Sequence, residues 1–264
     1  MPTLYPVPEL TRRRLKDLAS LHRKKHRDRA GEFLVEGLRS VESALAAGAS
    51  LVEILVTEEA SRDERVRALL DNASVSVHAV AARDLDRIAD TATTQGIVAV
   101  ARTALADADT LTGAIVALDG VQDPGNVGAI LRTAAWFGAD AVLAGPGTAD
   151  PFGPKAVRAA MGGLWDLRIA ATDDLAGALD RLRASGHPLF GADLDGEPAS
   201  AWSPPHAAVL VLGSEAHGLS GDVRARLDGR VRIGAPHADA DRPGVESLNV
   251  SVAAGVLLHR WLGG

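Results

Sequence analysis

Short apolar runs typical of buried β-strands alternate with stretches of helical periodicity along almost the whole chain of 264 residues. Strands and helices in alternation build α/β layers, in which helices cover both faces of a mostly parallel sheet. A domain holds roughly 150 residues, so the length suits one large or two small domains. Because a small, polar, acidic stretch interrupts the alternation, we predict a domain 1–104, a linker 105–112 and a domain 113–264.

The periodicity also gives approximate bounds for the elements. Strand patterns occupy residues 33–36, 52–56, 75–80, 96–100, 115–118, 141–143, 188–190 and 209–212. Helical patterns occupy residues 11–30, 37–47, 62–70, 82–88, 126–137, 154–162, 173–185 and 247–262. The last strands and helices of this series should form the larger of the two layered domains.

Positive charge is concentrated near the N-terminus. Residues 11–30 hold nine Lys and Arg against two Asp, a net charge of +7, although the whole chain carries −6. Such segregation favours an arm that binds nucleic-acid phosphates. Leucines at helical spacing beneath these charges fit a solvated basic helix equally well, and both interpretations stay open at this point. Aromatic residues make up only 3% of the chain, which argues against base stacking as the main means of recognition.

The composition excludes several classes of protein. The chain has no cysteine, which rules out disulfides, thiol nucleophiles, iron–sulfur clusters and thiolate zinc sites. No apolar run approaches the roughly 18 residues that span a bilayer. The first residues also lack the charged-then-apolar form of a signal peptide, so we expect a cytoplasmic protein without a membrane partner.

Three polar segments in the second half fall where a parallel sheet places its ligands. Such sheets bind ligands beyond the carboxyl ends of their strands. Residues 118–128 follow a strand and open a helix, residues 212–219 follow another strand, and residues 244–251 begin the last helix. We expect functional side chains in these three segments.

Common motifs do not account for these segments. Gly120, Gly125 and Gly128 lack the spacing of a dinucleotide fingerprint, and no Lys-Ser/Thr follows Gly125 as in a P-loop. The segment around Ser214 is not a nucleophile elbow. His22 with His26, or the group His237, Asp239 and Asp241, offers only a loose metal-ligand pattern, and we expect no functional metal.

Taken together, the three segments resemble the signature motifs of the SpoU/TrmH family of RNA 2′-O-ribose methyltransferases, which belong to the SPOUT class. They read DPGNVGAILRT at 123–133, LGSEAHGL at 212–219 and ESLNVSVA at 246–253, in the family's order. Residues 10–100 resemble the L30e-like domain that binds substrate in many members, with FLVEG at 33–37 and TQGIVAV at 94–100.

The resemblance implies a fold, a cofactor and an assembly. It implies an α/β chain whose C-terminal SPOUT domain has a parallel sheet and a trefoil knot, preceded by a smaller α/β L30e-like domain. It further implies S-adenosylmethionine as cofactor, an RNA substrate, and a homodimer formed through the C-terminal domain with active sites that use both chains. Composition alone would not have suggested a knot, because knots are very rare.

The resemblance also implies roles for individual residues. Asn126, Arg132, Glu215, Ser247 and Asn249 match the catalytic positions. A guanidinium stays protonated in proteins, so we assign Arg132 to clamping phosphate and polarising the attacking ribose oxygen rather than to general-base catalysis. Glu215 is the carboxylate that could align its neighbours or accept the proton. Ser247 is predicted to cap the last helix, with Asn249 in its first turn.

A second set of residues matches the positions that hold the cofactor, largely through backbone contacts: Leu212, Gly213, Gly218, Ile233 and Leu248. The candidates for RNA contact are basic: Arg23, Lys24, Lys25, Arg27 and Arg39. The sequence departs from the family after Ile233, where residues 234–244 form a longer, charged stretch in place of the usual Ile-Pro-Met. Because of that departure, the resemblance does not predict the detailed shape of the adenosine pocket.

Three functions remain in view. The first is S-adenosylmethionine-dependent 2′-O-ribose methylation of RNA, with 23S ribosomal RNA favoured because the N-terminal domain resembles a ribosomal RNA-binding module. Antibiotic resistance through such methylation is a special case of it. The second is the same reaction on transfer RNA, and the third is a non-catalytic RNA-binding or ribosome-assembly protein. The modified nucleotide itself is not encoded in a short motif.

Overall fold

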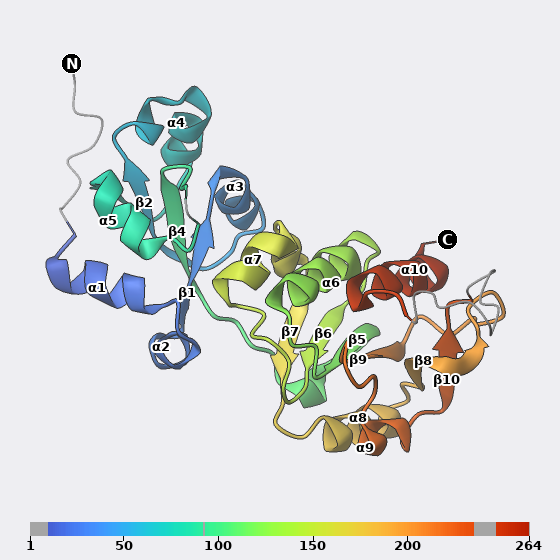
Figure 1. The fold of residues 1–264 in the computed structure, drawn as a ribbon. Coiled ribbons are helices and arrows are strands. Elements are labelled where there is room, and N and C mark those ends of the chain that lie inside the picture. Colours follow the sequence, from blue (N-terminus) through green and yellow to red (C-terminus); the bar gives the residue numbers. More distant parts are fainter. Residues whose placement is uncertain (1–9, 92, 235–246, 264) are drawn as a thin grey trace. The chain divides into compact units, whose positions relative to one another are not determined.

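The computed structural model describes residues 10–91, 93–234 and 247–263. These residues form two compact units. One comprises the residues up to Thr103 together with Phe152–Trp165, and the other comprises Ala104–Pro151 and Asp166–Gly264. Both units are α/β, as the alternation predicts (Figure 1).

The first unit is built on a mixed sheet with the order β1-β4-β2-β3. Its strands are β1 (Glu32–Glu36), β2 (Leu51–Thr57), β3 (Ser76–Val80) and β4 (Ile97–Arg102). Its helices are α1 (Arg12–Ser20), α2 (Lys24–Ala30), α3 (Leu38–Ala46), α4 (Glu64–Asp71), α5 (Ala82–Ile88) and α7 (Pro154–Ala160). β4 runs antiparallel to both β1 and β2, and only β2 and β3 are parallel. The prediction of a mostly parallel sheet is therefore wrong for this unit, because alternation of elements does not fix the direction in which a strand returns.

The segment 152–165 packs with the first unit although the sequence predicts it within the domain 113–264. The ring of Phe33 on β1 lies 5.0 Å from the ring of Phe152 and 5.8 Å from that of Trp165. Arg158 on α7 donates a hydrogen bond of 2.8 Å to Asp90. Local periodicity could not predict this assignment, because it depends on aromatic packing and an ion pair between residues far apart in sequence.

The basic region 11–30 forms two helices rather than the single predicted one. α1 ends at Ser20, and Arg23 has the extended backbone of an N-cap before α2. The guanidinium of Arg27 is buried and donates to the carbonyl oxygens of Leu21 (2.7 Å) and His22 (2.9 Å). These carbonyls would otherwise lack partners at the end of α1, so Arg27 stabilises the break between the helices.

The second unit is built on an all-parallel sheet with the order β10-β8-β9-β5-β6-β7. Its strands are β5 (Ala114–Asp119), β6 (Ala141–Ala144), β7 (Arg168–Ala171), β8 (Leu189–Pro198), β9 (Ala208–Gly213) and β10 (Gly229–Arg232). Its helices are α6 (Pro124–Trp136), α8 (Leu175–Ala184), α9 (Gly221–Arg224) and α10 (Val250–Leu262). β7 was not predicted, since a run of four residues that starts with an arginine gives little strand signal.

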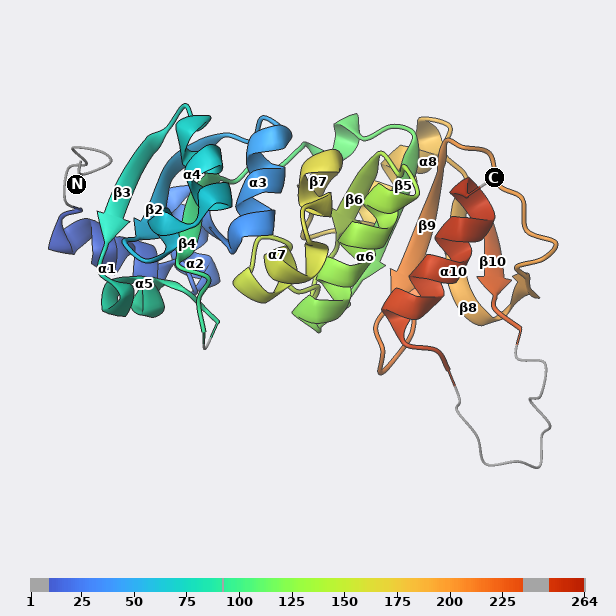
Figure 2. The same cartoon turned by 90° about the horizontal axis from the view of Figure 1, so that it is seen from above.

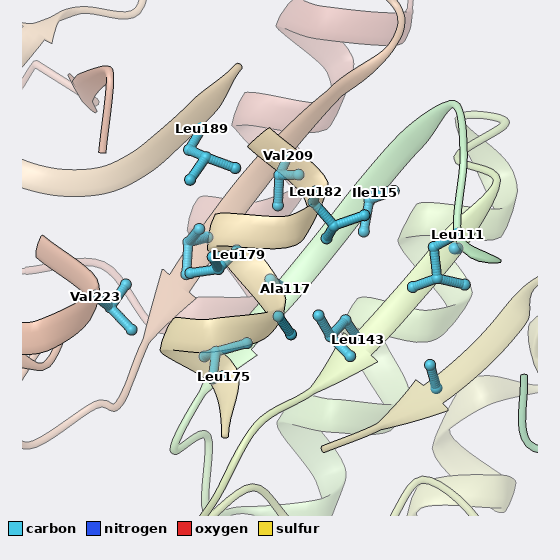
Figure 3. Close-up of a cluster of buried hydrophobic side chains, with 14 of the residues drawn as sticks. Leu111, Ile115, Ala117, Leu143, Leu175, Leu179, Leu182, Leu189, Val209 and Val223 are labelled. Atoms are coloured by element: carbon cyan, nitrogen blue, oxygen red, sulfur yellow. The ribbon is translucent and has the colours of Figure 1, made fainter. Parts of the chain in front are cut away.

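Helices cover both faces of this sheet. Figures 1 and 2 show α6 and α10 side by side on one face and α8 with α9 on the other. On the α8 side, Leu179 and Leu182 pack against Ile115, Val209 and Leu189 of the strands (Figure 3). The two central strands, β5 and β9, are buried from both sides, which fixes the carboxyl ends of these strands in the middle of one edge.

The stretch 105–112, predicted as a linker, is attached to the second unit. The amide of Ala106 donates to the carbonyl oxygen of Ile169 (2.8 Å) on β7, and Arg168 donates to Thr110. Leu111 is buried in the core below α8. No described helix is long and apolar enough to cross a membrane.

Candidate active site

The carboxyl ends of β5 and β9 lie next to each other. Asp119, the last residue of β5, pairs with Gly213, the last residue of β9. The loops that follow these strands therefore leave the same edge of the sheet. Asp119 accepts a hydrogen bond of 2.6 Å from the backbone amide of Ser220, which fastens the end of the second loop to the first strand.

The first loop leads into α6 through a well-defined helix cap. Asp123 Oδ1 accepts hydrogen bonds from the amides of Gly125 (2.6 Å) and Asn126 (3.1 Å), and Pro124 occupies the first helical position. Both features are typical of a stable helix start. Asn126 is thereby held in the first turn of α6, directly above the strand ends.

The second loop, 213–219, folds back tightly on the end of β9. A Cβ atom at Gly213 would lie 2.3 Å from the backbone carbonyl carbon of Gly218. Ser214 and Gly218 form an antiparallel bridge, and Gly218 has a φ of +66°, which favours glycine. The resulting turn presents Glu215 at its exposed tip.

Hydrogen bonds join residues of all three polar segments. Asn126 Nδ2 donates to Glu215 Oε1 (2.6 Å), and Asn249 Nδ2 donates to Asn126 Oδ1 (3.1 Å). Asn126 thus uses both ends of its carboxamide, which fixes its orientation. A carboxylate, held next to two oriented carboxamides at the edge of a parallel sheet, can align a hydroxyl and accept a hydrogen bond from it.

Asn249, and not Ser247, caps the last helix. α10 begins at Val250, and Asn249 Oδ1 accepts hydrogen bonds from the amide (2.9 Å) and the hydroxyl (2.6 Å) of Ser251. The prediction that Ser247 is the cap and Asn249 lies inside the helix is therefore wrong by two residues. Both residue types cap helices well, so the local sequence did not distinguish them, and Asn249 also donates to Asn126. Ser247 is exposed, with no hydrogen bond to the cluster.

Arg132 lies apart from this cluster. It follows Asn126 by six residues on α6, a rise of about 9 Å that also turns its side chain to another side of the helix. Its side chain is exposed and has no hydrogen-bond or ionic partner among the described residues. Within one chain, the structure thus brings together Asn126, Glu215 and Asn249, but not Arg132 or Ser247.

The residues predicted to hold the cofactor line the same edge of the sheet. Leu212 and Gly213 end β9, Gly218 closes the turn after it, and Ile233 directly follows β10. Leu248 is 47% exposed and precedes Asn249. The close approach of backbone at Gly213 leaves polar main-chain groups, rather than side chains, around the turn. Such an edge fits a nucleoside cofactor held largely by backbone contacts, with the carboxylate of Glu215 available to a cationic group.

Other contributors to the geometry were not singled out in the sequence. Asp119 accepts a hydrogen bond from the amide of Ser220 and so anchors the turn, and the amide of Ser251 donates to the cap residue Asn249. Asp119 directly follows the predicted strand 115–118, and this position could have indicated a functional side chain. The extended stretch 235–244 lies outside the described residues, as do His237, Asp239 and Asp241. Among the described residues, no group of three or more His, Asp or Glu could hold a metal ion.

The predicted RNA-contact residues belong to the first unit and differ in availability. Arg23, Lys25 and Arg39 are exposed and have no ionic partner among the described residues. Lys24 is exposed but pairs with Asp28 at 2.9 Å. Arg27 is 5% exposed and occupied by backbone carbonyls, so the structure removes it from the candidates.

Comparison with solved structures shows what class of protein has this fold. A protein of the TrmH family from Porphyromonas gingivalis is 36% identical, with a TM-score of 0.83 over 96% of this chain and 98% of that chain. An AdoMet-bound rRNA methyltransferase from Sinorhizobium meliloti is 29% identical, with a TM-score of 0.80 over 96% of this chain and 97% of that chain. The fold is therefore that of the RNA methyltransferases among these structures.

The chain belongs to the SpoU rRNA methylase family, whose model matches residues 113–259. Residues 12–99 match the model of the MRM3-like substrate binding domain. The Bacillus subtilis 23S rRNA (guanosine(2553)-2′-O)-methyltransferase RlmP is 32% identical over 95% of this chain and 96% of its own length. The family suggested by the three sequence motifs is thereby confirmed.

Proposed function

We infer that the protein transfers a methyl group from S-adenosylmethionine to a ribose 2′-hydroxyl of RNA, and that its substrate is 23S ribosomal RNA. The observation that carries this inference is the hydrogen-bonded set Asn126, Glu215 and Asn249, contributed by three distant motifs at one edge of the sheet. The family match and the similarity to the 23S rRNA enzyme RlmP support the substrate. We propose that it acts in the cytoplasm, which the similarity to the bacterial enzyme RlmP supports.

In this proposal the chain mainly aligns the reactants. S-adenosylmethionine, when bound, supplies an electrophilic methyl group, and the turn 213–219 with Ile233 and Leu248 holds its adenosine part. Asn249 orients Asn126, and Asn126 orients Glu215, whose carboxylate then accepts a hydrogen bond from the ribose hydroxyl. Correct placement of two reactants supplies a large share of the rate enhancement in such transfers.

The reaction is tested by nucleoside mass spectrometry of RNA from cells with and without the gene. We expect one 2′-O-methylated nucleotide of 23S rRNA to disappear when the gene is deleted. Loss of a methylated nucleotide from transfer RNA instead would redirect the proposal to that substrate. Saturating S-adenosylmethionine should also raise the melting temperature of the purified protein, because a ligand that binds only the folded state stabilises it. Absence of both effects would favour a non-catalytic RNA-binding protein.

We propose that the second unit forms a homodimer through α6 and α10. These helices pack together, with Gly255 close to Thr133, and carry large apolar side chains on their outer surface. Trp136 is 83% exposed, and Val252 and Val256, one turn apart, are 52% and 41% exposed. Exposed apolar side chains on two helices that pack together are typical of a protein interface.

The dimer would explain why Arg132 stands apart from the cluster. Arg132 precedes Trp136 by four residues and therefore lies on the same side of α6. In a dimer through this face, each Arg132 is placed beside the interface. We propose that it clamps the RNA phosphate at the active site of the partner subunit.

Trp136→Glu should convert the dimer into a monomer, because it buries a charge in an apolar interface. Light scattering coupled to gel filtration measures the mass directly. Leu194→Glu is the matched control, since Leu194 is also exposed (67%) but lies on β8. A Trp136→Glu protein with the mass of the unaltered dimer would disprove this interface.

We also propose that the C-terminal segment passes through a trefoil knot. β10 lies at one end of the sheet, yet α10, the next element in the chain, packs against α6 and β9 nearer its middle. The family resemblance implies the knot in this part of the chain.

The basic helices are expected to contribute a salt-dependent part of RNA affinity. Arg23, Lys25 and Arg29 are exposed and have no ionic partner among the described residues. Replacing all three by Ala should reduce the slope of log affinity against log salt by about two to three, since each phosphate contact contributes about 0.7–0.9. Fluorescence anisotropy with a transcript of 23S rRNA measures the slope. Arg67→Ala combined with Arg83→Ala, on α4 and α5, should leave it unchanged, and an equal change in both variants would argue against a dedicated surface.

A further inference from the structure

A third loop of the second unit supports the loop that leads into α6. It comprises residues 145–149 and follows β6, the strand next to β5, so it leaves the same edge of the parallel sheet. Resting on the proposed methyl transfer, we propose that Thr148 in this loop is a positioning residue for that reaction. Its hydroxyl holds the loop 118–123, and through it Asn126 and Glu215, in the arrangement that aligns the reactants.

The Thr148 hydroxyl bridges two backbone groups on either side of Asp119. It donates a hydrogen bond of 3.0 Å to the carbonyl oxygen of Leu118 and accepts one of 3.2 Å from the amide of Gly120. A hydroxyl carries one donor hydrogen and also accepts, so this side chain uses both capacities on the same short segment. The two bonds join residues 28 and 30 positions apart, and they therefore fix one loop relative to the other.

Two backbone hydrogen bonds complete the contact between these loops. The amide of Gly145 donates to the carbonyl oxygen of Leu118 (2.9 Å), and the amide of Ala149 donates to that of Val121 (2.9 Å). Of the groups in these four bonds, only the Thr148 hydroxyl belongs to a side chain. The residue whose amide it receives has a φ of +72° and, as a glycine, is conformationally permissive. The hydroxyl thus restrains the position at which the loop changes shape most easily.

The restrained loop leads to the site by two routes. Asp119, which lies between the two bridged backbone groups, accepts the hydrogen bond of 2.6 Å from the Ser220 amide that fastens the turn after β9. Asp123, further along the same loop, caps α6 and so places Asn126, which donates to Glu215 (2.6 Å). A displacement of this loop therefore moves the carboxamide and the carboxylate of the site, and a misplacement of about 1 Å costs a rate up to about a hundredfold.

Three substitutions separate the hydroxyl of Thr148 from the rest of its side chain. Thr148→Val keeps the shape and removes the hydroxyl, Thr148→Ser keeps the hydroxyl and removes the methyl group, and Thr148→Ala removes both. The rate is measured in a single turnover of the full-length protein with saturating S-adenosylmethionine and a 23S rRNA transcript. Thr148→Val and Thr148→Ala should lower this rate by about tenfold or more, whereas Thr148→Ser should keep it within about twofold.

The same variants should bind both reactants almost normally. The turn after β9 closes through its own bridge between Ser214 and Gly218. We therefore expect calorimetry with S-adenosylmethionine, and anisotropy with the transcript, to show affinities within about threefold of the unaltered protein. A general loss of stability would lower the amount of folded protein but would not be reversed by serine, so the split between rate and affinity and the rescue by Thr148→Ser identify positioning.

Thr172→Val is the matched control. Thr172 is partly buried like Thr148 and directly follows β7, in the same sheet. Its hydroxyl also donates to a carbonyl oxygen (3.2 Å) and accepts from an amide (3.1 Å), but both groups belong to Asp174, at the start of α8. The substitution removes the same kind of hydrogen bonds without touching the loop 118–123, and the rate of methyl transfer should stay unchanged.

The outcomes separate this inference from the proposed function. A full rate in Thr148→Val, equal losses in Thr148→Val and Thr148→Ser, or an equal loss in Thr172→Val would overturn the role of the hydroxyl, while methyl transfer to RNA would still stand. If Thr148→Val does not fold, Thr148→Ser and Thr148→Ala, which differ by one oxygen atom, decide in the same way. A loss confined to the affinity for S-adenosylmethionine, with a full rate at saturation, would overturn positioning in favour of cofactor binding. Failure of the unaltered protein to methylate RNA would overturn both proposals together.

Discussion

Arg132→Ala should lower the rate of methyl transfer by about a hundredfold to a thousandfold, the usual cost of removing one group that stabilises the reacting atoms. The affinity for S-adenosylmethionine should change by less than about twofold, because Arg132 is exposed and touches none of the predicted cofactor residues. Single-turnover transfer of a labelled methyl group measures the first quantity, and calorimetry measures the second. Arg67→Ala, an exposed arginine on α4, is the control and should retain activity.

A mixture of two inactive variants tests whether Arg132 acts in the partner subunit. Arg132→Ala and Asn126→Ala are each expected to be inactive, because each alters both sites of a symmetric dimer. A mixed dimer would have one site with both defects and one site with neither, so co-expression should restore about a quarter of the normal activity. Absence of restored activity, with mixed dimers present, would show that Arg132 serves its own chain or that the interface lies elsewhere.

Gly213→Ala should abolish detectable binding of S-adenosylmethionine. The added Cβ atom would meet the backbone of Gly218 and Leu219 at 2.3–2.5 Å, a clash with main chain that no side-chain rotation relieves. The turn 213–219 must open, which displaces both the cofactor edge and Glu215. We expect an affinity loss of at least about a hundredfold, and a loss of about 1–3 kcal/mol in the free energy of unfolding, as for other overpacked sites.

Gly221→Ala provides the matched control, since a Cβ at Gly221 would meet no atom within 4 Å. It begins the short helix α9, where alanine is well tolerated. Calorimetry with S-adenosylmethionine and urea unfolding would be run on both variants. If Gly213→Ala bound the cofactor as tightly as Gly221→Ala, the turn after β9 would not be the cofactor site.

The site was accessible from the sequence to a large extent, for a topological reason. In a parallel sheet every strand ends at the same edge, so polar residues directly after the patterns 115–118 and 209–212 had to lie close together. This is why the segments that hold Asn126 and Glu215 were both expected to carry functional side chains, although 89 residues separate these two. The segment 244–251, which holds Asn249, was expected to carry functional side chains at the start of the last helix, and the resemblance to a family motif then assigned Asn249 itself to the site.

The predictions from sequence were wrong where a side-chain contact, or the direction in which a strand runs, decided the local structure. The helix break before α2 depends on Arg27 turning back to two carbonyl groups, and the mixed sheet depends on the antiparallel entry of β4. α10 is capped by Asn249, which also bonds to Asn126. The contacts of Arg27 are local and the other two are tertiary, and none of them leaves a trace in hydrophobic periodicity.

The sequence by itself determined the α/β class, the basic N-terminal arm and the three polar segments, because these follow from periodicity, charge and order along the chain. Only the tertiary structure decided that Asn126, Glu215 and Asn249 form one hydrogen-bonded set, that Arg132 lies outside it, and that residues 152–165 join the first unit. The physical reason is that local pattern fixes which face of an element is buried, whereas hydrogen-bond partners and cavities depend on how distant elements pack against each other.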